Sequence, residues 1–196
     1  MIKIILATSN PHKLDEINAI NTNPDIVFDV VNGDFAPIEN GKNFIENATI
    51  KAKEAAKIMK TYCLADDSGL CVDALEGRPG IHSARYAETQ KEKIEKLLAE
   101  MKDVPYDWRA AHFVCSMVLV DKDGNVIHSE TGKVHGYIDD SPKGTNGFGY
   151  DPIFFIPSKN KTMAELPEEV KNDISHRANA LKPMLKWIEA NLVLHE

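Results

Sequence analysis

The stretch from Tyr62 to Gly69 changes abruptly from apolar to acidic. Its apolar first half, Tyr62 to Ala65, stops at two adjacent carboxylates, Asp66 and Asp67, which a serine and a glycine follow. We interpret the apolar run as a strand that ends there, because ligands of open α/β sheets bind beyond the carboxyl ends of strands. Adjacent carboxylates repel each other unless they share a cation or a proton. A divalent metal ion is the simplest partner, although such residues are also common in a solvated acidic turn.

Length and charge limit the classes of protein that this chain can belong to. With 196 residues, 43% hydrophobic and 27% charged, it is long enough for one domain with a substantial core. A net charge of -7 argues against a nucleic-acid backbone or an anionic membrane as the main partner, since both attract clustered lysine and arginine. We find no signal peptide and no apolar run near the roughly 20 residues of a membrane span, so we expect a cytoplasmic protein. The three cysteines form no Cys-x-x-Cys pair and are expected to be reduced.

The first 20 residues predict a strand, a loop and a helix. Ile2 to Ala7 is a short apolar run, and apolar residues then repeat at helical spacing from Leu14 to Ile20. Between them, Asn10 is a good N-cap and Pro11 suits the first helical position. Unpaired N–H groups at a helix start attract anions, and Lys13 adds a positive charge one turn later. The loop therefore predicts an anion site, with plain helix capping and a surface lysine as the alternative.

A second strand and a long helix follow. Residues 26–31 predict the strand, and the polar loop after it carries Glu39. Residues 43–59 have a capping-box start and a face of alanines, which predicts a helix that packs closely. Lys51 lies on this helix, where it either faces a binding site or is solvated.

The second half of the chain predicts a helix, a hairpin and a last helix. An apolar stripe predicts a helix capped by Thr89, and Asp123-Gly124 predicts a hairpin between strands 110–120 and 126–137. We expect the hairpin to contribute a second lobe. A glycine-rich loop at 142–149 precedes a short strand at 153–156, and a final helix, bent at Pro183, follows Ser175.

Chemistry-bearing residues accompany these late elements. Phe148 and Tyr150 either stack on a flat ligand ring or anchor the turn in the core, and His176 and Arg177 fall in the first turn of the last helix. Cations at a helix start are unfavourable unless an electron-rich ligand lies nearby. Carboxylates for a hard cation, an anion site with Lys13, and an aromatic and cationic end together match a nucleoside triphosphate with magnesium.

Six blocks, in order along the chain, resemble the motifs of the inosine triphosphate pyrophosphatase family. They are Thr8–Lys13, Phe44–Ala48, Ala65–Leu70, Pro79–Tyr86, Gly147–Pro152 and Ile174–Arg177. The resemblance implies an elongated α/β fold, with a mixed β-sheet flanked by helices and a central cleft between two lobes of a single domain. It also implies a homodimer that hydrolyses non-canonical purine nucleoside triphosphates (ITP, dITP and XTP) to monophosphate and pyrophosphate, with Mg²⁺ as the cofactor.

The resemblance also implies residue roles. Asp67 is similar to the family's general base and metal ligand, and Glu39 to a second metal-associated carboxylate. The substrate-binding residues implied are Thr8, Ser9, Asn10, Pro11, His12 and Lys13 for the phosphates, Ser68 for a further contact, and Phe148, Gly149, Tyr150, Asp151, Lys171, His176 and Arg177 for the nucleoside.

Three other functions stay open at this point. A pyrophosphatase of the Maf type would act on ordinary or methylated nucleotides. A regulatory module would bind nucleotides without turnover, which the paired carboxylates disfavour. A nucleic-acid-binding protein would show steeply salt-dependent affinity, which the acidic charge disfavours.

Overall fold

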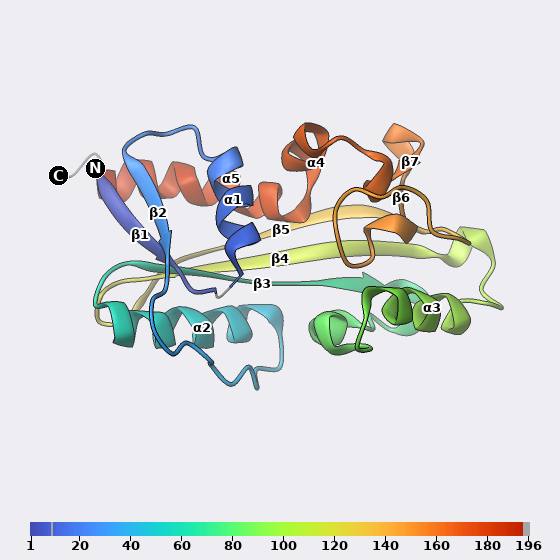
Figure 1. Cartoon of the computed structure of the whole chain (residues 1–196), viewed down its shortest axis with the longest axis horizontal. Helices are drawn as coiled ribbons and strands as arrows, with labels where there is room; N and C mark the ends of the chain where they lie inside the picture. Colours follow the sequence, from blue (N-terminus) through green and yellow to red (C-terminus); the bar gives the residue numbers. More distant parts are fainter. Residues whose placement is uncertain (9, 194–196) are drawn as a thin grey trace. The chain divides into compact units, whose positions relative to one another are not determined.

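The computed structural model describes residues 1–8 and 10–193, without the side chain of Pro11. None of the helices in this part of the chain is long and apolar enough to cross a membrane. The helices and strands (Figure 1) are β1 (Ile2–Leu6), α1 (Pro11–Ile20), β2 (Ile26–Val30), α2 (Phe44–Met59), β3 (Cys63–Val72), α3 (Gln90–Glu100), β4 (Ala110–Val120), β5 (Val126–Ile138), β6 (Phe154–Ile156), β7 (Lys161–Thr162), α4 (Glu168–Ile174) and α5 (His176–Ile188).

The strands of the described residues form one open, mixed sheet. Their order is β2-β1-β3-β4-β5-β6-β7. β1 pairs in parallel with both β2 and β3, whereas β6 pairs antiparallel with β5 and β7. β4 and β5 form the predicted antiparallel hairpin, since Asp121 N–H bonds to the carbonyl of Asn125 across the turn. The predicted mixed sheet flanked by helices is confirmed, and β7 is a strand that the sequence analysis missed.

The chain divides into two compact units. Unit 1 contains Met1–Asp67, Cys115–Gly132 and Arg177–Glu196, and unit 2 contains Ser68–Val114 and Lys133–His176. The prediction that the β4–β5 hairpin contributes a lobe of its own is wrong. The turn of the hairpin belongs to unit 1, and its open end belongs to unit 2. The single domain with a central cleft stays a prediction.

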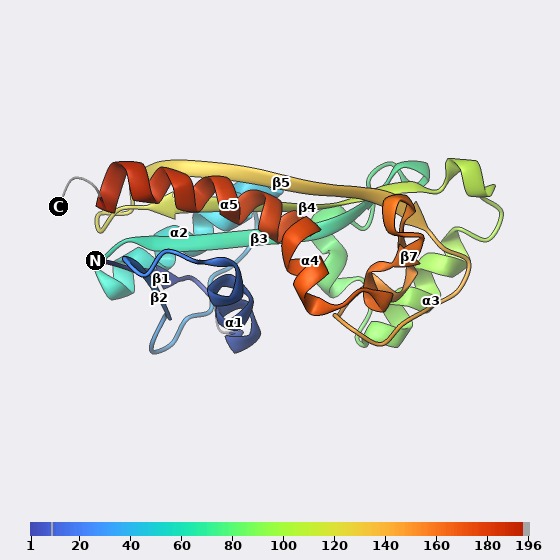
Figure 2. The same cartoon turned by 90° about the horizontal axis from the view of Figure 1, so that it is seen from above.

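Unit 1 has three layers, which follow from alternation along its strands. Successive side chains of a strand point to opposite faces. Ile4, Leu6 and Leu64 pack against α1 and α5, whereas Ile5 and Ala65 pack against the alanines of α2. Figure 1 shows α2 on one face of these strands, with α1 and α5 on the other. Figure 2 shows α5 running along the hairpin.

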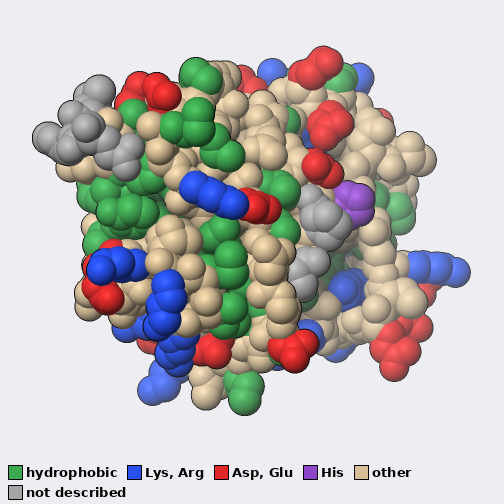
Figure 3. Space-filling view, turned by 60° about the vertical axis from the view of Figure 1, so that its left-hand side comes forward, with side chains coloured by type: hydrophobic (Ala, Val, Ile, Leu, Met, Phe, Trp, Pro, Cys, Tyr) green, Lys and Arg blue, Asp and Glu red, His purple; other side chains and the backbone are tan. Residues whose placement is uncertain are grey.

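Unit 2 has one core, built mainly on one face of its strands. Leu70, Val72, Phe113 and Ile138 pack there with residues of α3 and with Phe154 of β6. The predicted cap of α3 is confirmed, because Thr89 forms a capping box with Glu92. In the space-filling view of Figure 3, acidic and basic side chains are interspersed on the face drawn.

Candidate active site

Asp66 and Asp67 lie in the middle of a strand. β3 continues through them to Val72, so the prediction that the strand ends at Ala65 is wrong. Only the pairing with β1 stops here, at Leu64. Because strand side chains alternate, Asp66 lies on the face that α1 and α5 cover, and Asp67 on the face that α2 covers. Lys13 and Arg177 pair with Asp66, and Lys51 pairs with Asp67. A divalent metal ion at these carboxylates stays a prediction.

Asp66 is the centre of an ion network. Lys13 Nζ donates to its Oδ1 at 2.8 Å, and Arg177 Nη2 donates to its Oδ2 at 3.1 Å. Arg177 is itself 2% exposed and also pairs with Glu16 of α1. Burial by itself raises the pKa of Asp66, but the charges of Lys13, Arg177 and Lys51 outweigh it and hold the pKa well below its usual value. Asp66 therefore stays ionised and fixes Lys13 in place.

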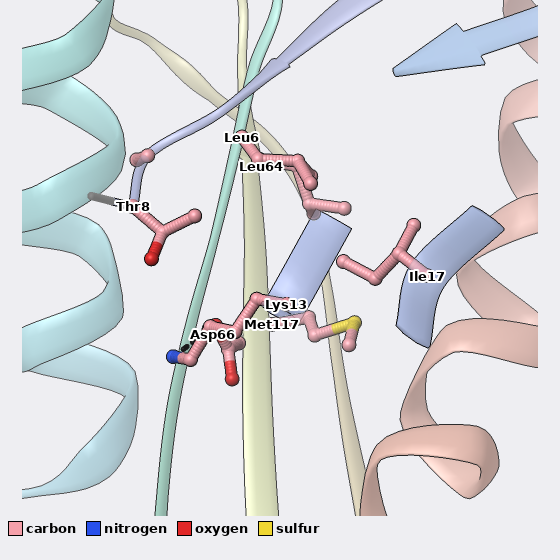
Figure 4. A pocket seen from close by; sticks show the side chains of 8 residues that line it. Leu6, Thr8, Lys13, Ile17, Leu64, Asp66 and Met117 are labelled. Atoms are coloured by element: carbon pink, nitrogen blue, oxygen red, sulfur yellow. Dashed lines mark hydrogen bonds and ion pairs between the residues drawn. The ribbon is translucent and has the colours of Figure 1, made fainter. Parts of the chain in front are cut away.

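Lys13 and Asp66 line a small cavity beside Thr8 (Figure 4). Its volume is about 10 Å³, close to the minimum for one water molecule. Leu6 and Leu64 supply apolar walls. The lysine side chain is 24% exposed, so its ammonium group combines a fixed position with access to solvent.

The loop before α1 has the predicted helix-start geometry. Thr8 Oγ1 accepts a hydrogen bond from Asn10 N–H at 3.1 Å, and Asn10 Oδ1 accepts one from His12 N–H at 3.0 Å. The His12 side chain is exposed. Ser9 and the side chain of Pro11 lie outside the described residues. Phosphate binding by this loop stays a prediction.

Asp67 is held on the opposite face beside a lysine and a second acid. Lys51 Nζ lies 3.6 Å from its Oδ1 and 3.4 Å from Oε2 of Glu39. Burial raises the pKa of Asp67, the Lys51 charge and a hydrogen bond from Asn47 oppose that rise, and the Glu39 and Asp66 charges add to it. The net effect is a raised pKa, so this carboxylate has a stronger tendency to take a proton than Asp66.

Asn47 also fixes the loop that carries Glu39. It is 1% exposed, and its Oδ1 accepts a hydrogen bond from Gly41 N–H at 2.8 Å. A Cβ on Gly41 would lie only 2.7 Å from that oxygen, so the close approach of loop and helix requires glycine. One buried amide thus positions both carboxylates.

The donor set around Asp67 suits a hard divalent cation. Asp67 Oδ2 is buried without a hydrogen-bond partner, which is costly for a carboxylate oxygen unless a ligand satisfies it. Glu39 supplies a second carboxylate close by, and oxygen ligands completed by water are what Mg²⁺ prefers. Among the described residues no group of three His, Cys, Asp or Glu side chains is placed to hold a metal.

A second predicted cluster lies in unit 2. Asp151 Oδ2 accepts hydrogen bonds from Lys171 Nζ at 2.8 Å and from Phe148 N–H at 3.1 Å. Gly147 has φ +74°, and a Cβ there would lie 2.1 Å from Asp151 Oδ2, so the turn requires glycine. Phe148 is 56% exposed, and Lys171 Nζ lies 4.6 Å from its ring centre. The loop therefore presents one aromatic ring from a fixed backbone.

The other predicted residues of unit 2 are largely buried. Tyr150 is 4% exposed, and its hydroxyl donates to the carbonyl of Ser83 at 2.8 Å. Tyr150 is therefore part of the core, as the alternative of a core-anchored turn predicts. His176 stacks on Phe113, with ring centres 5.0 Å apart. Ser68 is half-buried in β3.

Three residues of these clusters were missed or left open. The sequence does not decide whether Lys51 faces a binding site or the solvent. Its contacts with Glu39 and Asp67 assign it to the site. Glu16 was missed, although it follows Lys13 by one helical turn and so shares its face of α1. Asn47 was missed as a positioning residue, although it lies in the Phe44–Ala48 block that resembles a family motif.

Comparisons with known proteins match nearly the whole chain. The model of the Ham1 family matches residues 4–187. A dITP/XTP pyrophosphatase of Escherichia coli is 47% identical over 194 residues, which cover 94% of this chain and 97% of that protein. A dITP/XTP pyrophosphatase of Halalkalibacterium halodurans is 53% identical over 154 residues, 77% of this chain and 79% of that protein.

Solved structures agree with this assignment. The Ham1 protein of Staphylococcus aureus superposes with a TM-score of 0.88 at 40% identity, covering 96% of this chain and 99% of that one. A nucleoside-triphosphatase / dITP/XTP pyrophosphatase of Mycobacterium abscessus gives a TM-score of 0.76 at 38% identity, covering 94% and 99%. The resemblance seen in the sequence is confirmed, and this chain belongs to the Ham1 family.

Proposed function

We propose that this protein hydrolyses the non-canonical purine nucleoside triphosphates dITP, XTP and ITP to the monophosphate and pyrophosphate. The observation that carries the proposal is the setting of Asp67, a buried carboxylate with a raised pKa and one oxygen without a hydrogen-bond partner. Such a group is suited to general-base chemistry. Relatives at 45–53% identity that bear the name dITP/XTP pyrophosphatase support the substrate class.

In the proposed reaction, Asp67 takes a proton from a water molecule as that water attacks the α-phosphorus. The bond between the α-phosphorus and its bridging oxygen to the β-phosphate breaks, and pyrophosphate leaves. Burial and the neighbouring acids raise the pKa of Asp67, which favours proton transfer to it. Positioned acid–base catalysis of this kind contributes about a hundred- to ten-thousand-fold in rate.

We propose Mg²⁺ as the cofactor, held by Glu39 and Asp67. When bound, the cation would supply charge neutralisation on the phosphate oxygens. Lys51 lies within 3.6 Å of one oxygen of each acid and keeps their mutual repulsion low. The chain's own contribution is therefore a pre-arranged acidic pair with a lysine beside it.

Lys13 and the start of α1 are the proposed phosphate-binding groups. The Asp66 carboxylate holds the Lys13 ammonium at 2.8 Å, and Arg177 holds that carboxylate from the other side. A positively charged group that is fixed before the substrate arrives needs little reorganisation in the transition state. Asp66 and Arg177 thus act as positioning residues for Lys13.

Phe148, Asp151, Lys171 and His176 are proposed to recognise the nucleoside. The exposed Phe148 ring offers a stacking surface, and Lys171 and Asp151 fix its loop. A buried N–H group would donate a hydrogen bond to the six-position oxygen of hypoxanthine or xanthine. Adenine has an amine at that position, which cannot accept this hydrogen bond, so the buried N–H would have no partner and ATP would bind poorly. We further propose a cytoplasmic homodimer, because nucleotide pools are cytoplasmic and the family resemblance implies dimers.

Release of pyrophosphate from dITP, XTP, ATP and GTP at matched concentrations, with Mg²⁺ and with chelator, tests the proposal. We expect metal-dependent release that strongly favours dITP and XTP. Release mainly from ordinary or methylated nucleotides would favour a Maf-type enzyme. Nucleotide binding without any release would favour a regulatory module. The Asp67→Asn variant is the matched control for a contaminating phosphatase.

A further inference from the structure

Two histidines of unit 2 face each other across the β4–β5 pair, on the side of the strands away from the core. Ile138 N–H donates to the carbonyl of Arg109, and His135 and His112 lie three residues along each strand from that pair. In an antiparallel ladder this register puts His112 directly opposite His135, with both side chains on one face. The ring centres are 5.4 Å apart, and the ring planes are inclined by 37°.

This separation suits two imidazoles that bind one metal ion. A zinc–nitrogen bond of about 2.1 Å puts each ring centre about 3.2 Å from the metal, so a tetrahedral angle places the two centres about 5 Å apart. The observed 5.4 Å is close to that value. The rings are tilted and not flat against each other, so their nitrogens need only side-chain rotation to converge.

The surroundings leave room for the remaining ligands. Both histidines line a cavity of about 480 Å³, together with Asp73 and Tyr137. His135 is exposed and His112 is half-buried, so solvent reaches the pair. The cavity has room for several water molecules at about 30 Å³ each.

Neutral imidazole is the form of histidine that binds metals. The Asp73 carboxylate on the cavity wall supplies a negative charge that would offset part of the charge of a bound cation.

We propose that His112 and His135 form a second metal site, for a late first-row divalent cation such as Zn²⁺ or Cu²⁺. Imidazole nitrogen suits these ions, whereas Mg²⁺ requires oxygen ligands. The two imidazoles would be the protein ligands, with water completing the coordination, since the described residues contain no group of three His, Cys, Asp or Glu side chains placed to hold a metal. It is distinct in donor type from the acidic pair of unit 1, and its existence does not depend on the proposed activity.

Titration of the whole protein with Zn²⁺ in excess Mg²⁺ tests this inference, because Mg²⁺ occupies the oxygen-ligand sites. Binding is measured by calorimetry, and imidazole signals of the seven histidines are followed by NMR. We expect one equivalent of Zn²⁺ to shift the His112 and His135 signals together. Loss of either imidazole removes the intramolecular second ligand, so His112→Asn and His135→Asn should each weaken Zn²⁺ binding at least tenfold.

His82→Asn is the matched control, because His82 is an exposed histidine of the same unit outside this pair. It should keep the affinity of the wild type. The double variant should bind hardly more weakly than either single variant, since one loss already breaks the chelate. Equal affinity in the wild type and both single variants, or equal loss in His82→Asn, would overturn the inference. Unchanged Mg²⁺-dependent turnover and unchanged amide spectra elsewhere verify that the variants are folded.

Discussion

Asp66 and Asp67 are the same residue type one position apart, yet the molecule uses them in opposite ways. Asp66 accepts hydrogen bonds from Lys13 and Arg177, which hold its pKa well below the usual range. Asp67 has a longer 3.6 Å contact with Lys51 and a hydrogen bond from Asn47, and burial outweighs both and raises its pKa. Strand alternation sends the two carboxylates to different helices, so the difference comes from the surroundings and not from the residue. Asp66 has the ionised state and partners of a structural ion pair, and Asp67 has the raised pKa that the proposed general base requires.

Asp67→Asn should show the largest effect, a loss of turnover of about a hundred- to ten-thousand-fold. The amide cannot take the proton of the attacking water, whereas the binding groups stay in place. The free energy of unfolding should not fall. The pKa of Asp67 is higher in the folded than in the unfolded protein, so at neutral pH the ionised carboxylate destabilises the folded state. A neutral amide removes this destabilisation. Pyrophosphate release, substrate affinity and urea unfolding are the measurements, and near-wild-type turnover would refute the assignment of the base.

Asp66→Asn should show the reverse pattern. It leaves the buried Arg177 and the half-buried Lys13 without their shared carboxylate, and breaking a buried pair in this way costs about 3–5 kcal/mol. The folded pKa of Asp66 is depressed, so its stabilisation is fully present above the unfolded value near 3.8 and is lost as pH falls through the lower folded pKa. The gap in unfolding free energy between wild type and variant should therefore narrow in strong acid. A gap that stays constant down to pH 2 would contradict this account.

The sequence contained part of this comparison. The strand, helix and strand order, the caps at Asn10 and Thr89 and the mixed sheet could be predicted, because periodicity and capping are local. The error at Ala65 arose because two acids were interpreted as the end of a strand. The β-forming residues Leu70 to Val72 beyond them were a signal that the strand continues, and with it that adjacent acids face opposite ways.

The partners of the two acids were harder to predict. Lys51 comes from α2, the helix before β3, and Arg177 from α5 near the end of the chain, so both contacts depend on tertiary packing that no local pattern encodes. The same limit applies to Tyr150, whose ring is buried by packing and a hydrogen bond to Ser83. The phosphate, metal and nucleoside roles stay predictions.

Lys51→Met tests the role of Asp67 through the pH dependence of kcat/KM. The Lys51 charge lowers the pKa of Asp67, so its removal should move the acid limb of the kcat/KM profile to higher pH. Turnover falls as pH falls through the pKa of this base, because protonated Asp67 cannot accept a proton. Lys51→Arg keeps the charge and should keep the limb near its wild-type position. Movement of the limb to lower pH in Lys51→Met would show that another group controls it.

Glu16→Gln should have the smallest effect, and it tests whether the Asp66 network is graded. Glu16 is the outer partner of Arg177, and Asp66 still pairs with that arginine after the change. In the variant the amide oxygen of Gln still accepts the hydrogen bond from Arg177, but that bond is no longer assisted by a negative charge. We therefore expect a loss of about 1–2 kcal/mol in the free energy of unfolding, less than for Asp66→Asn. The kcat value and the acid limb set by Asp67 should be unchanged, because Glu16 is not among the groups that shift its pKa. The Asp66 charge already contributes to the raised pKa of Asp67. A shifted acid limb in Glu16→Gln would mean that the outer part of the Asp66 network, and not only the Asp66 charge, also acts on Asp67.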